Sequence, residues 1–184
     1  MFKKLVPALL ASSLVFSAAS VGAVGEVAYI RIIGQKTDAK SGLREKGRED
    51  MIQVSTISHT IVSPRDPQSG LPTGQRMHKP FVIQKELDKT SPALHGMLST
   101  NENISSATLK VWAPSAAGGL VREGEMPVYT VKLTNANIAS MELRMIKGAD
   151  GKDRLYEEIA FTYQKIEWTW AGSPPVTDDW TARQ

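Results

Sequence analysis

The chain contains no cysteine and only three histidines, His59, His78 and His95. The absence of thiols excludes disulfides, a cysteine nucleophile and cysteine-ligated metals. No two histidines have metal-site spacing, no Gly-x-Ser-x-Gly motif is present, and the glycine-containing stretch 147–153 fits neither a phosphate-binding loop nor a calcium loop. We therefore predict that the protein is not an enzyme and has no catalytic, cofactor-binding or metal-binding residues.

A strong net charge is also absent. Lysine and arginine number 22 against 19 aspartates and glutamates, which gives a formal net charge of +3. Removal of Lys3 and Lys4 with an N-terminal segment would leave 20 against 19, or +1. No basic stripe carries interleaved aromatic residues, so we predict no nucleic-acid partner.

Residues 1–23 form a segment of their own. Lys3 and Lys4 precede a mostly apolar run over residues 5–16, and small residues follow as far as Ala23. This order is typical of a secretory signal peptide of the Sec type, with cleavage after Ala19 or Ala23. The alternatives are a misassigned start codon or a disordered arm. The run is too short to span a membrane, so we predict no stable membrane insertion and a single globular domain over residues 24–184.

The last long segment of the domain, residues 154–170, alternates apolar and polar side chains. Ile159, Phe161 and Tyr163 hold odd positions, whereas Ile166 and Trp168 hold even ones. A period of two predicts a strand, and the change of phase predicts a bulge or a swap of its buried face. Residues 51–62 show the same change. Two bent strands in a small domain favour a strongly coiled barrel.

The remaining pattern predicts further strands and one helix. The helix begins at Thr90 or Ser91 as the capping residue, carries Pro92 in its first turn, and ends near residues 100–101. The polar segment 35–50 is predicted to project as a loop, 63–74 and 147–153 to be turns, and 114–124 to be a loop. The other strands are predicted over residues 27–34, 75–87 with a break or edge at Pro80, 104–112, 127–135 and 138–146. The predicted fold is mainly β, a small closed β-barrel of two curved sheets with one short flanking α-helix.

The polar residues have ordinary structural interpretations. We predict that His59 is packed and hydrogen-bonded, that His78 holds backbone groups at a strand bend, and that His95 is exposed on the helix. Glu86 and Asp88 could converge as paired carboxylates.

Lys85 and Lys89 lie beside these two carboxylates, so salt bridges are the commoner explanation. Asp178 and Asp179 are predicted to lie in a solvated turn rather than at a cation site.

Several segments together resemble the Hcp family, the haemolysin-coregulated proteins that form the inner tube of bacterial type VI secretion systems. They occur in order over nearly the whole domain: 47–54, His59 with 62–67, 70–94, 101–103, 129–135, 161–170 and 178–180. The resemblance implies a tight β-barrel that assembles as a homohexameric ring, with rings stacked head to tail. It further implies a contractile sheath, a spike protein and effector clients as partners. We expect the segment 35–50 to contribute to stacking.

The signal-like segment departs from the family pattern, because such proteins normally assemble in the cytoplasm and leave through the secretion machine itself. The leading hypothesis is a structural, secreted tube subunit that carries or shelters effectors, with cytoplasmic assembly if the signal is not used. The alternative is an exported Hcp-like binding or chaperone module that builds no tube.

Overall fold

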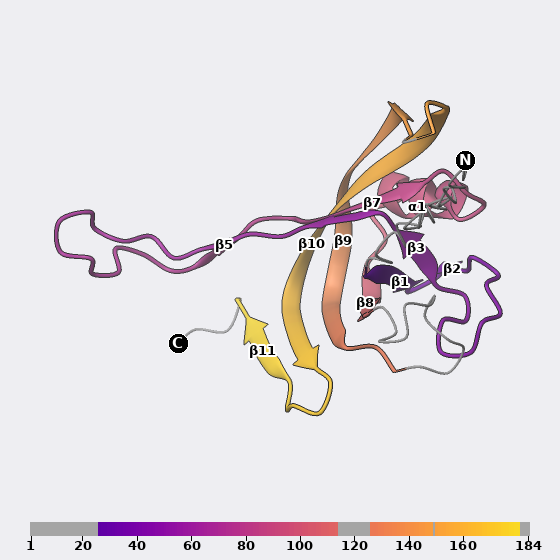
Figure 1. Cartoon of the computed structure of the whole chain (residues 1–184). Helices are drawn as coiled ribbons and strands as arrows, with labels where there is room; N and C mark the ends of the chain where they lie inside the picture. The colour runs from indigo at the N-terminus through magenta and orange to yellow at the C-terminus, as the bar shows by residue number, and fades with distance from the viewer. Residues whose placement is uncertain (1–25, 114–125, 149, 181–184) are drawn as a thin grey trace, which may run out of the picture.

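The computed structural model describes residues 26–113, 126–148 and 150–180. The signal-like segment 1–23 and the predicted loop 114–124 lie outside these residues. The described chain forms a nine-stranded antiparallel sheet, a two-stranded ribbon and one helix (Figure 1). The elements are β1 (Val27–Gly34), β2 (Asp38–Ala39), β3 (Ile52–Val54), β4 (Thr56–Ser58), β5 (Ile61–Val62), β6 (Met77–His78), β7 (Phe81–Glu86), α1 (Ser91–Ser99), β8 (Ile104–Trp112), β9 (Tyr129–Lys147), β10 (Asp153–Trp170) and β11 (Val176–Asp179).

The sheet follows one path, β2-β1-β8-β9-β10-β7-β4, with β3 added to β1 and β11 added to β10. The prediction of a mainly β fold with one short helix is confirmed. The predicted closed barrel of two sheets is wrong, because these strands form one sheet that is not closed into a barrel. The consecutive strands β3 and β4 pair with β1 and β7 respectively, so this segment spans from one part of the curled sheet to the other.

β9 and β10 form a long antiparallel ribbon at the centre of the sheet (Figure 1). The sequence predicted two strands over 127–135 and 138–146, but β9 is continuous, because pairing with β10 persists across Ala136 and Asn137. A register shift opposite Ala160–Phe161 leaves one extra residue in β9. Such a bulge bends a strand without ending it.

The predicted change of phase in β10 is confirmed. Ile159, Phe161 and Tyr163 are buried, and Ile166 is the next buried residue after them. The change falls opposite Asn135, which has a positive φ of 49° and donates a side-chain hydrogen bond to Gln164 at 2.9 Å. Asparagine tolerates this left-handed conformation better than most residues, which makes the local twist accessible.

The phase change predicted within residues 51–62 marks a break between strands. Ile52 and Val54 are buried in β3, whereas Ile57 and Ile61 are exposed. At the break, the Ser55 amide donates to the Gln84 carbonyl of β7 at 2.7 Å. The chain thereby passes from pairing with β1 to pairing with β7.

The helix α1 begins where the sequence predicted, but its first turn is held differently. Thr90 is the N-cap residue without a side-chain capping bond, and its hydroxyl instead donates to Asp88 at 2.5 Å. Pro92 lies in the first turn, as predicted. The helix ends before Asn101, whose φ of 49° is typical of the residue that closes a helix C-terminus.

The core lies inside the curl of the sheet, between the sheet and α1. Its members alternate along the strands, as a half-buried antiparallel sheet requires. They include Ile30, Ile32, Ile52, Phe81, Ile83, Leu94, Met97, Ile104, Leu109, Leu133, Ile159, Phe161 and Ile166.

Residues 59–80, called the arm from here on, run far out from the body and return (Figure 1). β5 pairs with β6 near its root, and an isolated bridge joins Arg65 to Pro72 near its tip. All of these residues are described, and most are exposed, although the His78 side chain at the root is only 3% exposed. The turn-rich segment predicted over residues 63–74 therefore forms the tip of a long projection.

The segment 35–50 is mostly exposed and stands out as a loop beside β2, but several contacts fasten it to the body (Figure 1). Arg48 is buried, with its guanidinium over the rings of Tyr29 and Trp112 at 5.3 and 5.8 Å from their centroids. Glu102 accepts hydrogen bonds from the amides of Lys36 and Thr37, both at 2.7 Å. These cation–π and hydrogen-bond contacts hold the polar segment against the body.

Shortening the arm should leave the core intact. Replacing residues 64–75 with Asn-Gly would place a two-residue turn between Ser63 and Arg76, which continue the β5–β6 register. We expect the free energy of unfolding to change by less than about 1 kcal/mol in urea titrations, because surface changes rarely cost more. The control Phe161→Ala removes a buried ring and should cost about 3–5 kcal/mol. A loss above about 2 kcal/mol for the shortened arm would contradict the expectation.

Candidate interaction site

A cluster of polar and aromatic side chains joins the root of the arm to the body. Tyr163, on the inner face of β10, has its hydroxyl 2.6 Å from His59 Nε2 and 2.8 Å from His78 Nδ1. His59 lies where the arm leaves β4, and His78 lies at the end of β6 where it returns. One buried hydroxyl therefore bridges the outgoing and returning strands.

A second layer of contacts comes from β11. Asp178 accepts a bidentate pair of hydrogen bonds from the Arg76 guanidinium and lies 3.1 Å from His78 Nε2. The Arg76 hydrogen bond is the main cause that lowers the pKa of the Asp178 carboxyl, so it is ionised at neutral pH. The Trp180 ring stacks on His78 with centroids 6.4 Å apart, and its indole N–H donates to the Tyr163 carbonyl.

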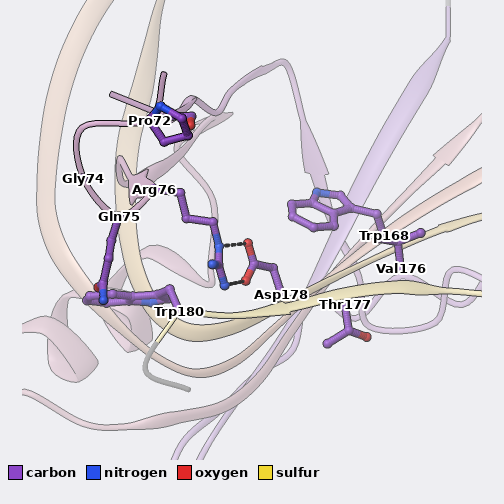
Figure 2. A pocket seen from close by; sticks show the side chains of 10 residues that line it. Pro72, Gly74, Gln75, Arg76, Trp168, Val176, Thr177, Asp178 and Trp180 are labelled. Carbon is purple, nitrogen blue, oxygen red and sulfur yellow. Dashed lines mark hydrogen bonds and ion pairs between the residues drawn. The ribbon is translucent and has the colours of Figure 1, made fainter. Parts of the chain in front are cut away.

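A groove of about 620 Å³ lies between the arm and β11. Figure 2 shows the Arg76–Asp178 pair between the rings of Trp168 and Trp180, with Pro72 of the arm beyond them. Trp180 and Val176 are both substantially exposed. Exposed aromatic residues and arginine are enriched at protein–protein interfaces, which makes this groove a candidate contact surface.

The order Asp178, His78, Tyr163 places a carboxylate, an imidazole and a hydroxyl in line. A nucleophile needs access to substrate and a lowered pKa or an adjacent free base. Tyr163 is only 5% exposed, and burial, followed by the charge of Asp178, raises the pKa of its hydroxyl. The arrangement therefore suits a structural hydrogen-bond network rather than group transfer.

A second polar cluster fastens α1 to the sheet. The Lys85 side chain is fully buried, and its ammonium donates to Glu157 at 2.9 Å and to Ser91 Oγ at 3.0 Å. Lys85 and Glu157 lie directly opposite each other in the β7–β10 ladder. Asp88 adds a second carboxylate 3.0 Å from the ammonium.

Opposing influences act on the pKa of the Asp88 carboxyl. Burial is the largest single influence and favours its protonated form, but bonds from Thr90 and Lys85 together lower the pKa of the carboxyl. The Lys85 side chain donates to Ser91 Oγ, and the Ser91 hydroxyl donates in turn to Glu157 at 2.5 Å, so both hydrogen-bonding roles of the hydroxyl are filled within the cluster. This cluster orients the helix and offers no activated serine.

The structure confirms three of the sequence-based predictions for these residues. His59 is packed and hydrogen-bonded and His95 is exposed, as predicted. Glu86 and Asp88 form salt bridges, with Arg154 and Lys85 respectively, rather than a carboxylate pair.

Two of the predictions are wrong. His78 contacts the Tyr163 and Asp178 side chains instead of holding backbone groups. Asp178 and Asp179 belong to β11 rather than to a solvated turn, because β11 pairs with β10.

Sequence reasoning missed the Lys85–Glu157 pair. The alternation could have revealed it. Lys85 lies two and four residues after the buried Ile83 and Phe81, and Glu157 lies two residues before the buried Ile159, so both charged side chains fall on buried faces. Opposite charges at buried positions of two strands indicate a buried ion pair.

No group of three or more histidines, aspartates or glutamates in residues 26–113, 126–148 and 150–180 could hold a metal ion. Over the same part of the chain, no helix combines the length and apolar character needed to cross a membrane.

Comparison with known proteins identifies the class of the fold. The family described as "Type VI secretion system effector, Hcp" matches residues 12–170. The chain is 35% identical over 167 residues to the major exported protein of Pseudomonas aeruginosa, covering 83% of this chain and 94% of that protein.

Solved structures agree with the sequence match. A crystal structure of an Hcp protein superposes with a TM-score of 0.74 at 27% identity, covering 84% of this chain and 98% of that one. A secreted Hcp protein of Pseudomonas aeruginosa gives a TM-score of 0.64 at 29% identity, covering 83% and 99%. The chain therefore belongs to the Hcp family and is a secreted tube protein of the type VI secretion system.

The buried ion pair can be tested by truncating one partner. Lys85→Met removes the buried ammonium from Glu157 and leaves the half-exposed His95 ring, 3.4 Å away, as its remaining basic neighbour, so we expect the free energy of unfolding to fall by about 3–5 kcal/mol in denaturant titrations. The double variant Lys85→Met with Glu157→Leu should be more stable than Lys85→Met alone. As a control, Arg144→Ala breaks an exposed pair with Glu142 and should cost less than about 1 kcal/mol. Equal losses for the buried and exposed pairs would contradict this role.

Proposed function

We propose that this chain is a structural subunit of the type VI secretion inner tube, whose copies form homohexameric rings that stack head to tail. The observation that carries the proposal is the match to the Hcp family over residues 12–170 together with the shared fold. The role needs no catalysis, and we propose no catalytic, cofactor or metal site. We further propose, from family membership, that the sheath, the spike protein and effector clients are its partners, without nucleic acid.

A closed ring and a stack both need different surface patches on one subunit to meet each other. The described surface has exposed apolar side chains in separate places, which supports this proposal. At the free end of the β9–β10 ribbon, Leu143, Met145 and Leu155 extend the inward-facing row beyond the core. Solitary exposed apolar residues are ordinary, but contiguous ones indicate an interaction surface.

The arm and the opposite end of the ribbon carry further patches. Ile61, Val62 and Met77 are exposed on the paired part of the arm. Trp170 and Val176 are exposed near the other end of β10. The arm also reaches far beyond the body (Figure 1), which suits a contact with a neighbouring subunit. The comparisons do not favour the alternative of an exported binding module that builds no tube.

A charge placed at the ribbon end should block assembly without unfolding the subunit. We expect Leu143→Glu with Met145→Glu to lose hexamers and stacked rings in native mass spectrometry and electron microscopy, because buried unpaired carboxylates oppose association. The melting temperature of the isolated subunit should change by no more than a few degrees, since both side chains are exposed.

The matched control is Ser140→Glu, an exposed position on the opposite face of the same ribbon. It adds a charge to the face of the ribbon that lies away from Leu143 and Met145, so rings should still form. Intact rings in the double variant would contradict a contact at the ribbon end.

Whether residues 1–23 are retained or removed distinguishes assembly in the cytoplasm from export before assembly. Under the tube proposal, we expect protein from the cytoplasmic fraction to keep residues 1–23, or to begin late at an internal start, and to have a hexameric mass. N-terminal sequencing and native mass of the cytoplasmic and exported fractions would check this. A chain cut after Ala19 or Ala23, found only outside the cytoplasm and not hexameric, would instead support the exported binding module.

A further inference from the structure

The C-terminal strand β11 and the arm meet at one edge of β10. Because β9 pairs along almost the whole of β10, β7 and β11 share the other edge of that strand. β7 pairs with β10 as far as Phe161, and β11 pairs with it from Lys165 to Trp168. The chain that precedes β7 therefore finds the next positions of this edge occupied by β11, and it leaves the sheet as the arm.

Neither element is fixed by a core of its own. In β11, Val176 and Thr177 are exposed, whereas Asp178 and Asp179 are half-buried. Most residues of the arm are exposed. A two-stranded ribbon by itself is only marginally stable in water. Both elements therefore depend on a few specific contacts for their order.

Asp178 makes the main contacts between the two elements. Its carboxylate accepts two hydrogen bonds from the Arg76 guanidinium, the one from Nε at 2.5 Å, and lies 3.1 Å from His78 Nε2. Arg76 also donates to the Asp179 backbone carbonyl at 3.5 Å. The Trp180 ring, which follows β11 directly, stacks on the His78 imidazole. The returning strand of the arm is thus joined to β11 through both a side-chain network and a backbone contact.

The Arg76–Asp178 pair is shielded enough to matter energetically. The two side chains are 27% and 16% exposed, compared with 48% and 58% for the pair of Arg144 with Glu142. Exposed ion pairs contribute little to stability because water screens them. A bidentate pair of charge-assisted hydrogen bonds in a partly shielded site is stronger and fixes the relative orientation of its partners.

The other anchor of the arm does not replace this one. Tyr163 on β10 contacts His59 on the outgoing strand and His78 on the returning strand. Trp180 donates its indole N–H to the Tyr163 carbonyl, so the segment after β11 is joined to this anchor as well. The arm, β11 and the inner row of β10 therefore form one continuous set of contacts.

We propose that β11 and the arm form one cooperative unit, in which Asp178 is the positioning residue that couples the C-terminal strand to the direction of the arm. Loss of the contact with Arg76 loosens both elements and opens the groove between them. The coupling is a property of the single chain. Its consequence, that β11 controls how the arm meets a neighbouring subunit, rests on the proposed tube function.

Coupling of this kind is reciprocal by thermodynamic necessity. If docking of β11 raises the ordered fraction of the arm by some factor, an ordered arm raises the docked fraction of β11 by the same factor. A change on either side should therefore loosen both elements. Removing both partners of one contact should cost no more than removing one, because the contact is lost only once.

The test is amide hydrogen exchange of the full chain, under conditions in which the rate reports the open fraction. The reporter in the arm is the Lys79 amide, which donates to the Thr60 carbonyl at 3.0 Å. The reporter in β11 is the slowest amide of residues 176–179. We expect Arg76→Met and Asp178→Asn each to speed both reporters about tenfold, because each variant removes the charge-assisted pair. The double variant should show the same change of about tenfold.

Two controls make the result specific. Arg144→Met breaks an exposed ion pair elsewhere on the β9–β10 ribbon and should leave both reporters unchanged. The Ile159 amide of the core should exchange at one slow rate in every variant, because the proposed unit lies outside the core.

Three results would overturn the coupling. The first is faster exchange confined to the element that carries the substitution. The second is a change of about a hundredfold in the double variant, which would indicate independent effects. The third is an Ile159 amide that speeds up as much as the reporters, which would indicate global unfolding rather than a local unit.

Native mass spectrometry of the same samples keeps the two proposals separate. Hexamers in which the arm and β11 exchange independently would overturn the coupling and leave the tube function standing. Coupled exchange in a chain that never forms hexamers would support the coupling and overturn the tube function.

Discussion

The pairing of β9 with β10 is the interaction on which the rest of the structure depends. These strands, of 19 and 18 residues, pair along almost their whole length. β8 attaches to β9, whereas β7 and β11 attach to β10 at successive positions, so the order of the sheet follows from this ribbon. The bulge in β9 and the left-handed Asn135 bend the ribbon, and the bend lets one sheet curl around a core.

The inward-facing row of β10 also organises both polar clusters. Glu157 and Tyr163 belong to one alternating row, with Ile159 and Phe161 between them. Glu157 binds Lys85 and thereby places α1, whereas Tyr163 binds two histidines and thereby places the arm. A single strand thus orients two separate elements through buried polar groups, which demand specific partners where apolar contacts do not.

This construction fits a protein whose work is assembly. The buried polar groups orient a helix and an arm, and neither cluster exposes an activated nucleophile. The β9–β10 ribbon extends beyond the core, so Leu143, Met145 and Leu155 at its end are exposed in the single described chain. Membership of the Hcp family gives these surfaces their context, because a tube subunit must present different patches to different neighbours.

The sequence alone determined the fold class, most strand positions, the start of the helix, the phase changes and the family. These properties follow from alternation, turn residues and helix signals, which act over a few neighbouring residues. Only the tertiary structure decided that β9 is continuous, that residues 59–80 form a long arm, and which residues pair across the chain. His59, His78, Tyr163 and Asp178 are separated by up to about 120 positions, and no local pattern specifies that they meet. Their contact depends on strand register, which is set by the burial of whole faces of the sheet rather than by the residues themselves.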